Sequence, residues 1–246
     1  MIYSPTEQFE LKPLLMMNGN MTFSMTNYVM YLMLVMSFMY GYLALTKGVK
    51  LGWTRWGVAM NAMYDTVLNM VNSQVGNKGG YYFPLMFTLF NFMLLANLMS
   101  MMPYSFAMSA QMVAMVSLSL SLWFGVTIIG LNKHGLTFFS LFVPSGTPLP
   151  LVPVLVLIET LSYSSRALSL GLRLSANVLS GHLLMLILGS LMFNLMSVSL
   201  FTFMGGIVPM MAVMAIIMLE VAISMIQSYV FCILFSGYLK DSIDTH

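Results

Sequence analysis

The run Ser169-Leu-Gly-Leu-Arg-Leu-Ser-Ala-Asn177 places one permanently charged side chain, Arg173, in the middle of a long apolar stretch. From Leu174 to Leu219 the sequence contains no Lys, Arg, Asp or Glu. A guanidinium in hydrocarbon costs roughly 2.5–3.5 kcal/mol on insertion scales, and Arg cannot escape that cost by losing its proton. Within a membrane segment such a residue marks the path of an ion as a rule, so Arg173 is the first candidate for a functional residue.

The composition indicates an integral membrane protein. Of 246 residues, 59% are hydrophobic and 7% are charged, and the mean hydropathy is +0.90. Soluble domains carry about 25% charged residues. The net charge of +2 and the lack of a basic patch argue against a nucleic-acid partner. Because the chain has one cysteine, Cys232, it can form no internal disulfide and no Cys-rich metal site, and we expect neither a metal nor a cofactor.

The positions of the charged residues predict how one membrane domain, over 1–246, is divided. We expect about five membrane-embedded helices and one surface helix, an all-α protein. The expected parts are an N-terminal segment (1–27), a first span (28–46), a surface amphipathic helix (53–75), a helical hairpin (84–131) and two long helices (148–240).

The hairpin follows from length. The uncharged stretch from Gly79 to Asn132 would be about 80 Å long as one helix, whereas the bilayer core is about 30 Å thick. We expect it to turn at 100–105, where Pro103 lies. Further on, the pattern favours a continuous helix from Leu155 to about Leu200, and a cut at Gly181 into two spans is the alternative.

The segment 53–75 has a different pattern. Positions 56, 60, 63, 67, 70 and 71 are apolar and fall on one helical face, and positions 61, 65, 69 and 72 are polar and fall on the opposite face. This spacing is typical of a helix lying at a membrane surface, with Trp at the headgroup level. The alternative is a connecting helix that packs on other protein.

The basic residues outside the spans predict the orientation. With five crossings and the N-terminus outside, only Lys12 lies on the outer side. Six basic residues then lie on the inner side: Lys47, Lys50, Arg55, Lys78, Lys133 and Lys240. This bias predicts an outer N-terminus and an inner C-terminus.

The two long helices contain the charged candidates. Glu159, Arg166 and Arg173 are spaced seven residues apart, which is nearly two helical turns, so they share one face, and Asn177 follows one turn later. Arg166 has an acid nearby in sequence, and a pair with Glu159 that merely holds helices together is its simpler interpretation. Arg173 has no carboxylate within a turn, so its acid must come from elsewhere.

The last helix carries Glu220 and Gln227 on one face, together with Ser224. His182 lies five residues beyond Asn177. A satisfied interior histidine is one interpretation of His182. Together with Glu220 it favours a proton path, because both side chains exchange protons.

The block Ser169-Leu-Gly-Leu-Arg173-Leu-Ser-Ala-Asn177-Val-Leu-Ser-Gly-His182 resembles the signature of subunit a of the F-type ATP synthases in its mitochondrial form. The start, Ser4-Pro-Thr-Glu-Gln-Phe-Glu10, is similar to fungal versions, and Glu220 with Gln227 and the ending Gly237-Tyr-Leu-Lys-Asp241 match as well. The similarity covers essentially the whole chain. The order of His182 before Glu220 is the mitochondrial arrangement, and the 29 methionines fit an organelle-encoded gene.

The resemblance implies a non-catalytic, proton-translocating stator subunit in the mitochondrial inner membrane, with its last two helices steeply tilted. Its partners would be a ring of small proteolipid c subunits, the peripheral stalk, other membrane-sector subunits and, through the complex, the ATP-hydrolysing head. Two offset half-channels would carry protons to and from carboxylates of the rotating ring, separated by Arg173.

By matching positions, the resemblance also implies the roles of the remaining candidates. His182 and Glu220 belong to the outer half-channel, with Asn177 and Gln227 as polar lining near Arg173. The inner half-channel would contain Glu159 and Asp241, and Arg166 would pair with Glu159 or line the inner path.

Other functional classes fit the sequence less well. The chain contains no phosphate-binding loop and no H-E-x-x-H, C-x-x-C or G-x-S-x-G motif, so any ATP chemistry belongs to partner subunits. A stand-alone proton-coupled transporter is the alternative, but no internal repeat and few polar groups for a solute pocket are present. A purely structural anchor would not need an unpartnered Arg173.

Overall fold

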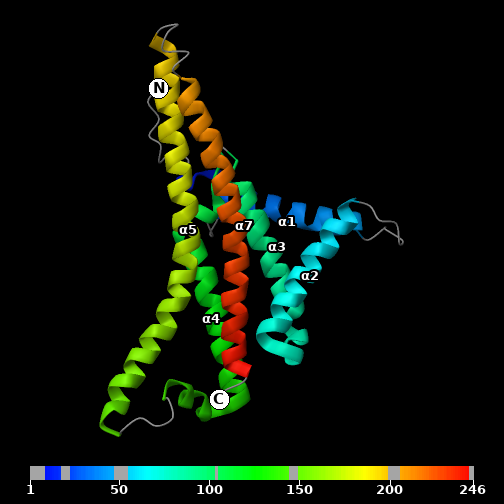
Figure 1. The fold of residues 1–246 in the computed structure, drawn as a ribbon, viewed down its shortest axis with the longest axis vertical. Coiled ribbons are helices and arrows are strands. Elements are labelled where there is room, and N and C mark those ends of the chain that lie inside the picture. The colour runs from blue at the N-terminus through cyan, green and yellow to red at the C-terminus, as the bar shows by residue number, and fades with distance from the viewer. Residues whose placement is uncertain are drawn as a thin grey trace. The chain divides into compact units, whose positions relative to one another are not determined.

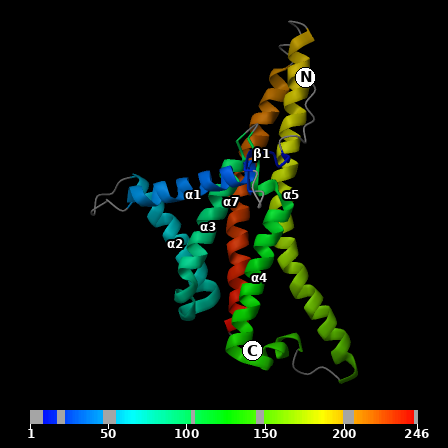
Figure 2. The same ribbon diagram turned by 180° about the vertical axis from the view of Figure 1, so that it is seen from behind.

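The computed structural model describes residues 9–17, 23–46, 55–102, 105–143, 149–198 and 206–243. Figures 1 and 2 show the elements from two opposite sides. Their order is β1 (Pro13–Met17), β2 (Phe23–Thr26), α1 (Asn27–Thr46), α2 (Arg55–Val75), η2 (Gly76–Tyr82), α3 (Phe83–Ser100), η3 (Met108–Ala110), α4 (Met112–His134), η4 (Gly135–Phe142), η5 (Leu149–Leu151), α5 (Val152–Val198) and α7 (Ile207–Ile243), where η denotes a 3₁₀ helix.

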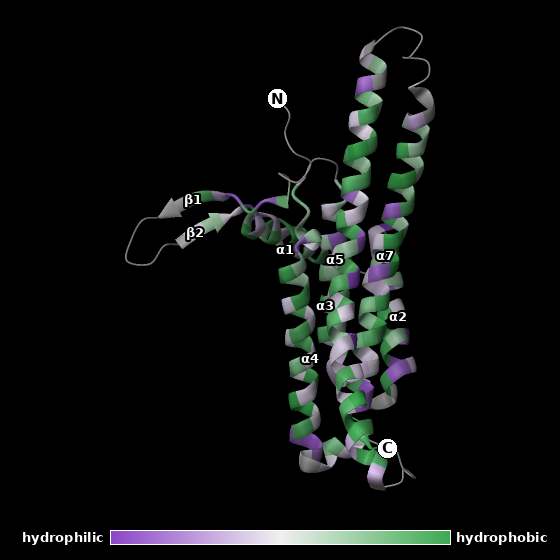
Figure 3. Cartoon of the chain, turned by 90° about the vertical axis from the view of Figure 1, so that its left-hand side faces the viewer, coloured by the Kyte–Doolittle hydropathy of each residue, from purple (hydrophilic) through white to green (hydrophobic). Residues whose placement is uncertain are grey.

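Five helices in the described ranges are long and apolar enough to cross a membrane. In hydrocarbon every backbone N–H and C=O must be paired within the segment, and an α-helix achieves this. Figure 3 shows hydrophobic colour over most of the long helices, with hydrophilic positions recurring along α5 and α7. The prediction of an all-α membrane protein is therefore confirmed. The candidate spans are Asn27–Ala44, Gly79–Ser100, Met112–His134, Val152–Asn194 and Pro209–Ile243.

The two last helices are longer than a bilayer is thick. α5 has 47 residues and α7 has 37, which correspond to about 70 Å and about 55 Å of helix against a hydrocarbon core of about 30 Å. Neither helix can therefore stand upright within the core. α5 runs through Gly181 without a break, so the alternative of two separate spans is wrong.

The hydroxyl groups within the spans are satisfied locally. Thr88 on α3, Ser117 on α4 and Ser190 on α5 each donate to the carbonyl oxygen three residues earlier, at 2.9, 2.8 and 2.8 Å. A hydroxyl bonded to its own helix exposes no unpaired donor to lipid. The serines of these apolar helices therefore do not by themselves indicate a polar path.

Helix α2 has the two faces that the sequence predicts. Its polar face at positions 61, 65, 69 and 72 is exposed, and its apolar face is buried at Val67, Met70 and Val71. The ring of Tyr64 packs edge-on against the ring of Phe83, with centroids 4.9 Å apart. The second half of α2 thus packs on the start of α3, as the connecting-helix alternative expects. A place at the membrane surface stays a prediction.

Contacts within the chain group the residues into two compact units, which we describe separately. Unit 1 comprises 1–57, 91–111 and 174–228, and unit 2 comprises 58–90, 112–173 and 229–246. Several positions used above lie outside the described residues or their described side chains: Met1 to Gln8, Lys47, Lys50, Lys78, Pro103 and Leu200.

In unit 1 a short antiparallel hairpin of β1 and β2 precedes α1, a feature the sequence analysis did not predict. Pro13 pairs with Thr26 and Met17 with Phe23, and a bulge lies between Pro13 and Leu15. The backbone N–H of Asn27 donates to Lys12 O at 3.2 Å, which extends the pairing to the start of α1. The strands show no alternation of apolar and polar residues, so only their pairing defines them.

Helix α1 packs on the segment that follows α3. Val35, Ala96 and Met108 form a buried cluster, and the Tyr31 hydroxyl accepts a hydrogen bond from the backbone N–H of Phe106 at 3.4 Å.

In unit 2 the end of α4 is tied to the end of α7. Lys133 Nζ donates to Ile243 O at 3.0 Å, and His134 Nε2 lies 3.1 Å from the same oxygen. The last carbonyl groups of a helix have no partner within the helix, and a cation complements the negative end of the helix dipole. These contacts therefore fix the C-terminal end of α7.

Gly171 marks a close approach of α5 to α4. A Cβ at Gly171 would lie 2.7 Å from Ser119 Oγ and 2.8 Å from Met115 O, and the second of these is backbone that cannot move aside. In an exposed helix, Gly to Ala stabilises by about 0.5–1 kcal/mol, but overpacking costs about 1–3 kcal/mol.

We therefore expect Gly171→Ala to lower the midpoint of thermal unfolding of the protein in its native membrane complex. Gly125→Ala is the matched control, because nothing lies within 4 Å of a Cβ there, and it should leave the midpoint equal or higher. Equal midpoints for the two variants would contradict the close packing of α4 and α5.

Candidate functional site

The first group of polar residues lines a cavity in unit 1. The cavity has a volume of about 470 Å³ and lies among α3, the second half of α5 and the first half of α7. Asn177, Glu220 and Gln227, three of the candidates from the sequence, line it together. A cavity needs roughly 10–15 Å³ per water and polar partners, so this one can hold several waters next to the three side chains.

Glu220 is the buried acid of this cavity. Its side chain is 7% exposed, and neither carboxylate oxygen has a hydrogen-bond partner among the described residues. Burying such a group without a partner is costly. The cavity borders this residue, and both carboxylate oxygens themselves are covered.

Gly181 allows α5 and α7 to meet beside this acid. A Cβ at Gly181 would collide with the Glu220 carboxylate. The absence of a side chain on α5 is therefore what lets the carboxyl group lie against that helix.

His182 lies elsewhere than expected. It is 2% exposed and is not one of the cavity-lining residues. Its Nε2 forms a hydrogen bond with Ser100 O at the end of α3, and its ring meets the ring of Phe9 edge-on, with centroids 6.1 Å apart. Successive helical residues point about 100° apart, so Gly181 faces Glu220 while His182 faces α3 and the N-terminal segment.

Residues at the end of α3 link these two places. Ser100 Oγ donates to Asn97 O at 2.7 Å, and Asn97 Nδ2 donates to Ser224 O on α7 at 3.3 Å. Asn97 also lines the cavity, and its Oδ1 is buried without a partner in the described part of the chain. The sequence analysis missed Asn97 and Ser100. A buried amide within an otherwise apolar span is the signal that indicates Asn97.

The second group of polar residues lies in unit 2. The Tyr163 ring on α5 packs edge-on against the Tyr238 ring on α7, with centroids 6.1 Å apart. Arg166 and Asp241 both lie close enough to interact electrostatically with these two tyrosines, and Arg173 lies close enough to interact with Tyr238. The first half of α5 and the end of α7 therefore bring Arg166 and Asp241 to one aromatic pair. Neither tyrosine was a candidate from the sequence.

The expected pair of Arg166 and Glu159 does not form. Arg166 is exposed and donates to Ser162 Oγ at 3.4 Å, one turn earlier on the same helix. Glu159 is partly buried, and its carboxylate takes part in no ion pair within the described ranges. That Arg166 lines the inner path stays a prediction.

Arg173 is exposed on α5. Its guanidinium forms no hydrogen bond or ion pair with any residue of the described chain; the ion pair found there joins Lys12 and Glu10 at 3.7 Å. An unpartnered cation on an apolar helix requires an anion from outside the polypeptide.

The eight candidate residues divide equally between the two units. Unit 1 contains Asn177, His182, Glu220 and Gln227, and unit 2 contains Glu159, Arg166, Arg173 and Asp241. Within the ranges that the structure covers, no three His, Cys, Asp or Glu side chains gather as metal ligands.

Comparison with known proteins identifies the family of the chain. The family model for the ATP synthase A chain matches residues 24–240. ATP synthase subunit a of Debaryomyces hansenii is 69% identical and that of Candida albicans 64%, each over the full length of both chains. The subunit of Saccharomyces cerevisiae is 50% identical over all of this chain and 97% of its own length. The chain therefore belongs to the ATP synthase subunit a family.

Proposed function

We propose that this chain is the proton-conducting stator subunit of the membrane sector, with two offset half-channels separated by Arg173. As a member of its family it works within the F-type ATP synthase, in ATP synthesis and proton transport. The observation that carries the finer proposal is the exposed Arg173 guanidinium, which has no acid of its own among the described residues.

The outer half-channel is formed by unit 1 in this proposal. The cavity beside Glu220, with Asn177 and Gln227 in its wall, supports a wet path to a buried acid. Glu220 exchanges protons with that water, and the amides of Asn177 and Gln227 hold the water by donating and accepting hydrogen bonds. His182 exchanges protons on the other side of α5, next to Ser100 and Asn97.

The inner half-channel is formed by unit 2. Arg166 and Asp241 interact electrostatically with the tyrosine pair of Tyr163 and Tyr238. Glu159 lies about two turns before Arg166 on the same helix. These groups form a polar route among otherwise apolar helices, and a proton released from the ring can follow it.

Arg173 separates the two paths. A unit charge pair at 4 Å is worth about 4 kcal/mol at an effective dielectric constant near 20. This is enough to favour the ionised form of a ring carboxyl group as it passes, so that its proton leaves. The same charge repels hydronium and prevents a direct leak between the half-channels.

We also propose which subunits the chain contacts and how it lies in the membrane. The chain faces a ring of small proteolipid c subunits and contacts the peripheral stalk and other membrane-sector subunits. As a multi-pass protein of the mitochondrial inner membrane, it has its N-terminus in the intermembrane space and its C-terminus in the matrix, following the bias of its basic residues.

Replacement of the central cation should uncouple proton flow from synthesis. In assembled complexes with Arg173→Ala, we expect gradient-driven ATP synthesis to fall about a hundredfold or more, because the charge that releases the ring proton is lost. ATP hydrolysis by the head should persist once it is freed from the membrane sector. The measurement is both rates per assembled complex in inner-membrane vesicles.

Arg55→Ala is the matched control for this loss. Arg55 is an exposed arginine at the start of α2, outside both polar groups, and its replacement should leave synthesis unchanged. Synthesis at the normal rate in Arg173→Ala would remove the central role of Arg173.

The assignment of Glu220 to proton uptake predicts a one-sided dependence on proton concentration. Glu220→Gln should slow synthesis, because the amide cannot take up and release a proton. At constant total driving force, a higher proton concentration on the outer side should partly restore the rate, and a higher concentration on the inner side should not.

Glu159→Gln is the comparison for the inner path. A higher proton concentration on the outer side should not restore its rate of synthesis. The same response of Glu220→Gln to both sides would contradict its assignment to the outer half-channel.

A further inference from the structure

The His182 ring is fixed at both its edge and its nitrogen. Nε2 bonds to Ser100 O, and because a carbonyl oxygen can only accept, Nε2 must carry the hydrogen. In the neutral ring Nδ1 is then the nitrogen that can take up a proton. The orientation of the ring therefore decides where a proton can enter and leave His182.

Phe9 is the aromatic neighbour of this ring. The two rings meet at 85° with centroids 6.1 Å apart, an edge-to-face arrangement that aromatic pairs prefer. Phe9 also packs on a buried cluster of Ala107, Ala110 and Val178. It thus joins α5 to the segment between α3 and α4 at the place where His182 lies.

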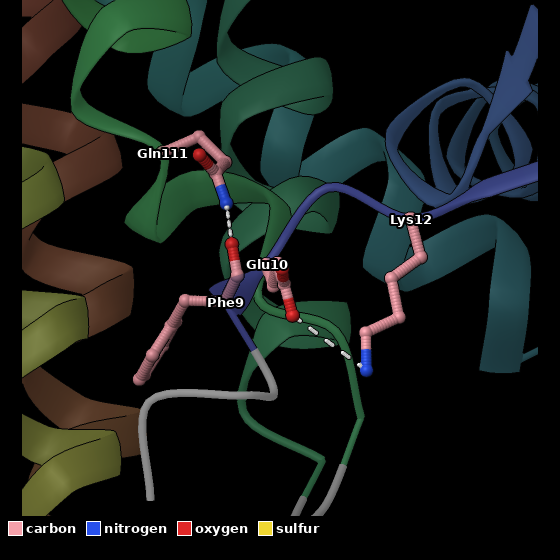
Figure 4. A network of polar contacts seen from close by, with 4 residues as sticks. All are labelled: Phe9, Glu10, Lys12 and Gln111. Atoms are coloured by element: carbon pink, nitrogen blue, oxygen red, sulfur yellow. Dashed lines mark hydrogen bonds and ion pairs between the residues drawn. The ribbon is translucent and has the colours of Figure 1, made fainter. Parts of the chain in front are cut away.

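The backbone of Phe9 is held independently of its ring. Phe9 O accepts a hydrogen bond from Gln111 Nε2 at 2.7 Å. Figure 4 shows the Gln111 amide directed at this carbonyl, with the Phe9 ring turned away from the ion pair of Glu10 and Lys12. The two strands that follow Phe9 pair with each other, and Lys12 O accepts a hydrogen bond from the backbone N–H of Asn27 at the start of α1. The chain is therefore held at Phe9 and again at the strands that follow it.

We propose that Phe9 is a positioning residue that holds His182 in the orientation required for proton transfer. It keeps Nε2 on Ser100 O, leaves Nδ1 for proton exchange, and covers the ring against bulk water on the side of the N-terminal segment. Without Phe9 the ring can turn away from Ser100 and meet water directly. This inference rests on the proposed function, since Phe9 then acts only through His182.

The size of the effect follows from the contact. An edge-to-face aromatic pair shifts an equilibrium by about two- to tenfold. We therefore expect Phe9→Ala to lower gradient-driven ATP synthesis per assembled complex by about two- to tenfold. Phe9→Tyr keeps the ring and should restore most of the rate. Leu11→Ala, which removes an exposed side chain two residues later, is the control and should have no effect.

A double-mutant cycle tests whether Phe9 acts through His182. In a His182→Ala background, Phe9→Ala should cause no further loss, because no imidazole remains to be positioned. A second loss of the same factor would show that Phe9 acts on its own and would overturn the inference. If Phe9→Ala does not assemble, Phe9→Leu keeps most of the apolar volume and serves in the same cycle.

The outcomes separate this inference from the function on which it rests. Normal synthesis in His182→Ala would remove His182 from the proton path and with it the proposed outer half-channel. A loss in His182→Ala together with normal synthesis in Phe9→Ala would leave the half-channel standing and overturn the role of Phe9 alone.

Discussion

The cost of keeping the Arg173 guanidinium on an apolar helix is the constraint on which the rest of the structure depends. The group is charged at every accessible pH, and it is exposed, with no anion of its own chain among the described residues. Such a helix is tolerable only where an anion arrives from outside. In the proposed function the ring supplies that anion, one carboxylate after another, and the chain therefore has to conduct the protons that these carboxylates accept and release.

Polar groups in the described helices differ in how they are satisfied. Hydroxyl groups such as those of Thr88 and Ser190 bond to their own helices. The buried Glu220, in contrast, has neither oxygen paired within the described residues, and it borders a cavity large enough for water. Gly181 brings α5 against this acid. A buried acid without a protein partner next to room for water is an arrangement suited to exchanging a proton, and a poor one for holding helices together.

The sequence predicts the large features because they depend on length and hydropathy alone. The five candidate spans follow from uncharged stretches and bilayer thickness. The apolar pattern favours the unbroken helix through Gly181 but leaves a cut into two spans open, and the structure decides between them. Helical spacing places Glu220 and Gln227 on one face, and the family resemblance adds Asn177 to them. The hairpin of β1 and β2, the place of His182 against Ser100 and Phe9, and the contact of Asn97 with Ser224 could not be predicted. They depend on contacts between segments far apart in the chain, and a rotation of about 100° between Gly181 and His182 decides which of them meets Glu220.

The most direct test of the account is the distance from the Arg173 guanidinium to the nearest ring carboxylate in an intact assembly. The account predicts an N to O distance within the ion-pair range of about 4 Å for the carboxylate that faces α5. A guanidinium paired instead with Glu159 or Asp241 of its own chain, or directed at lipid headgroups, would contradict it.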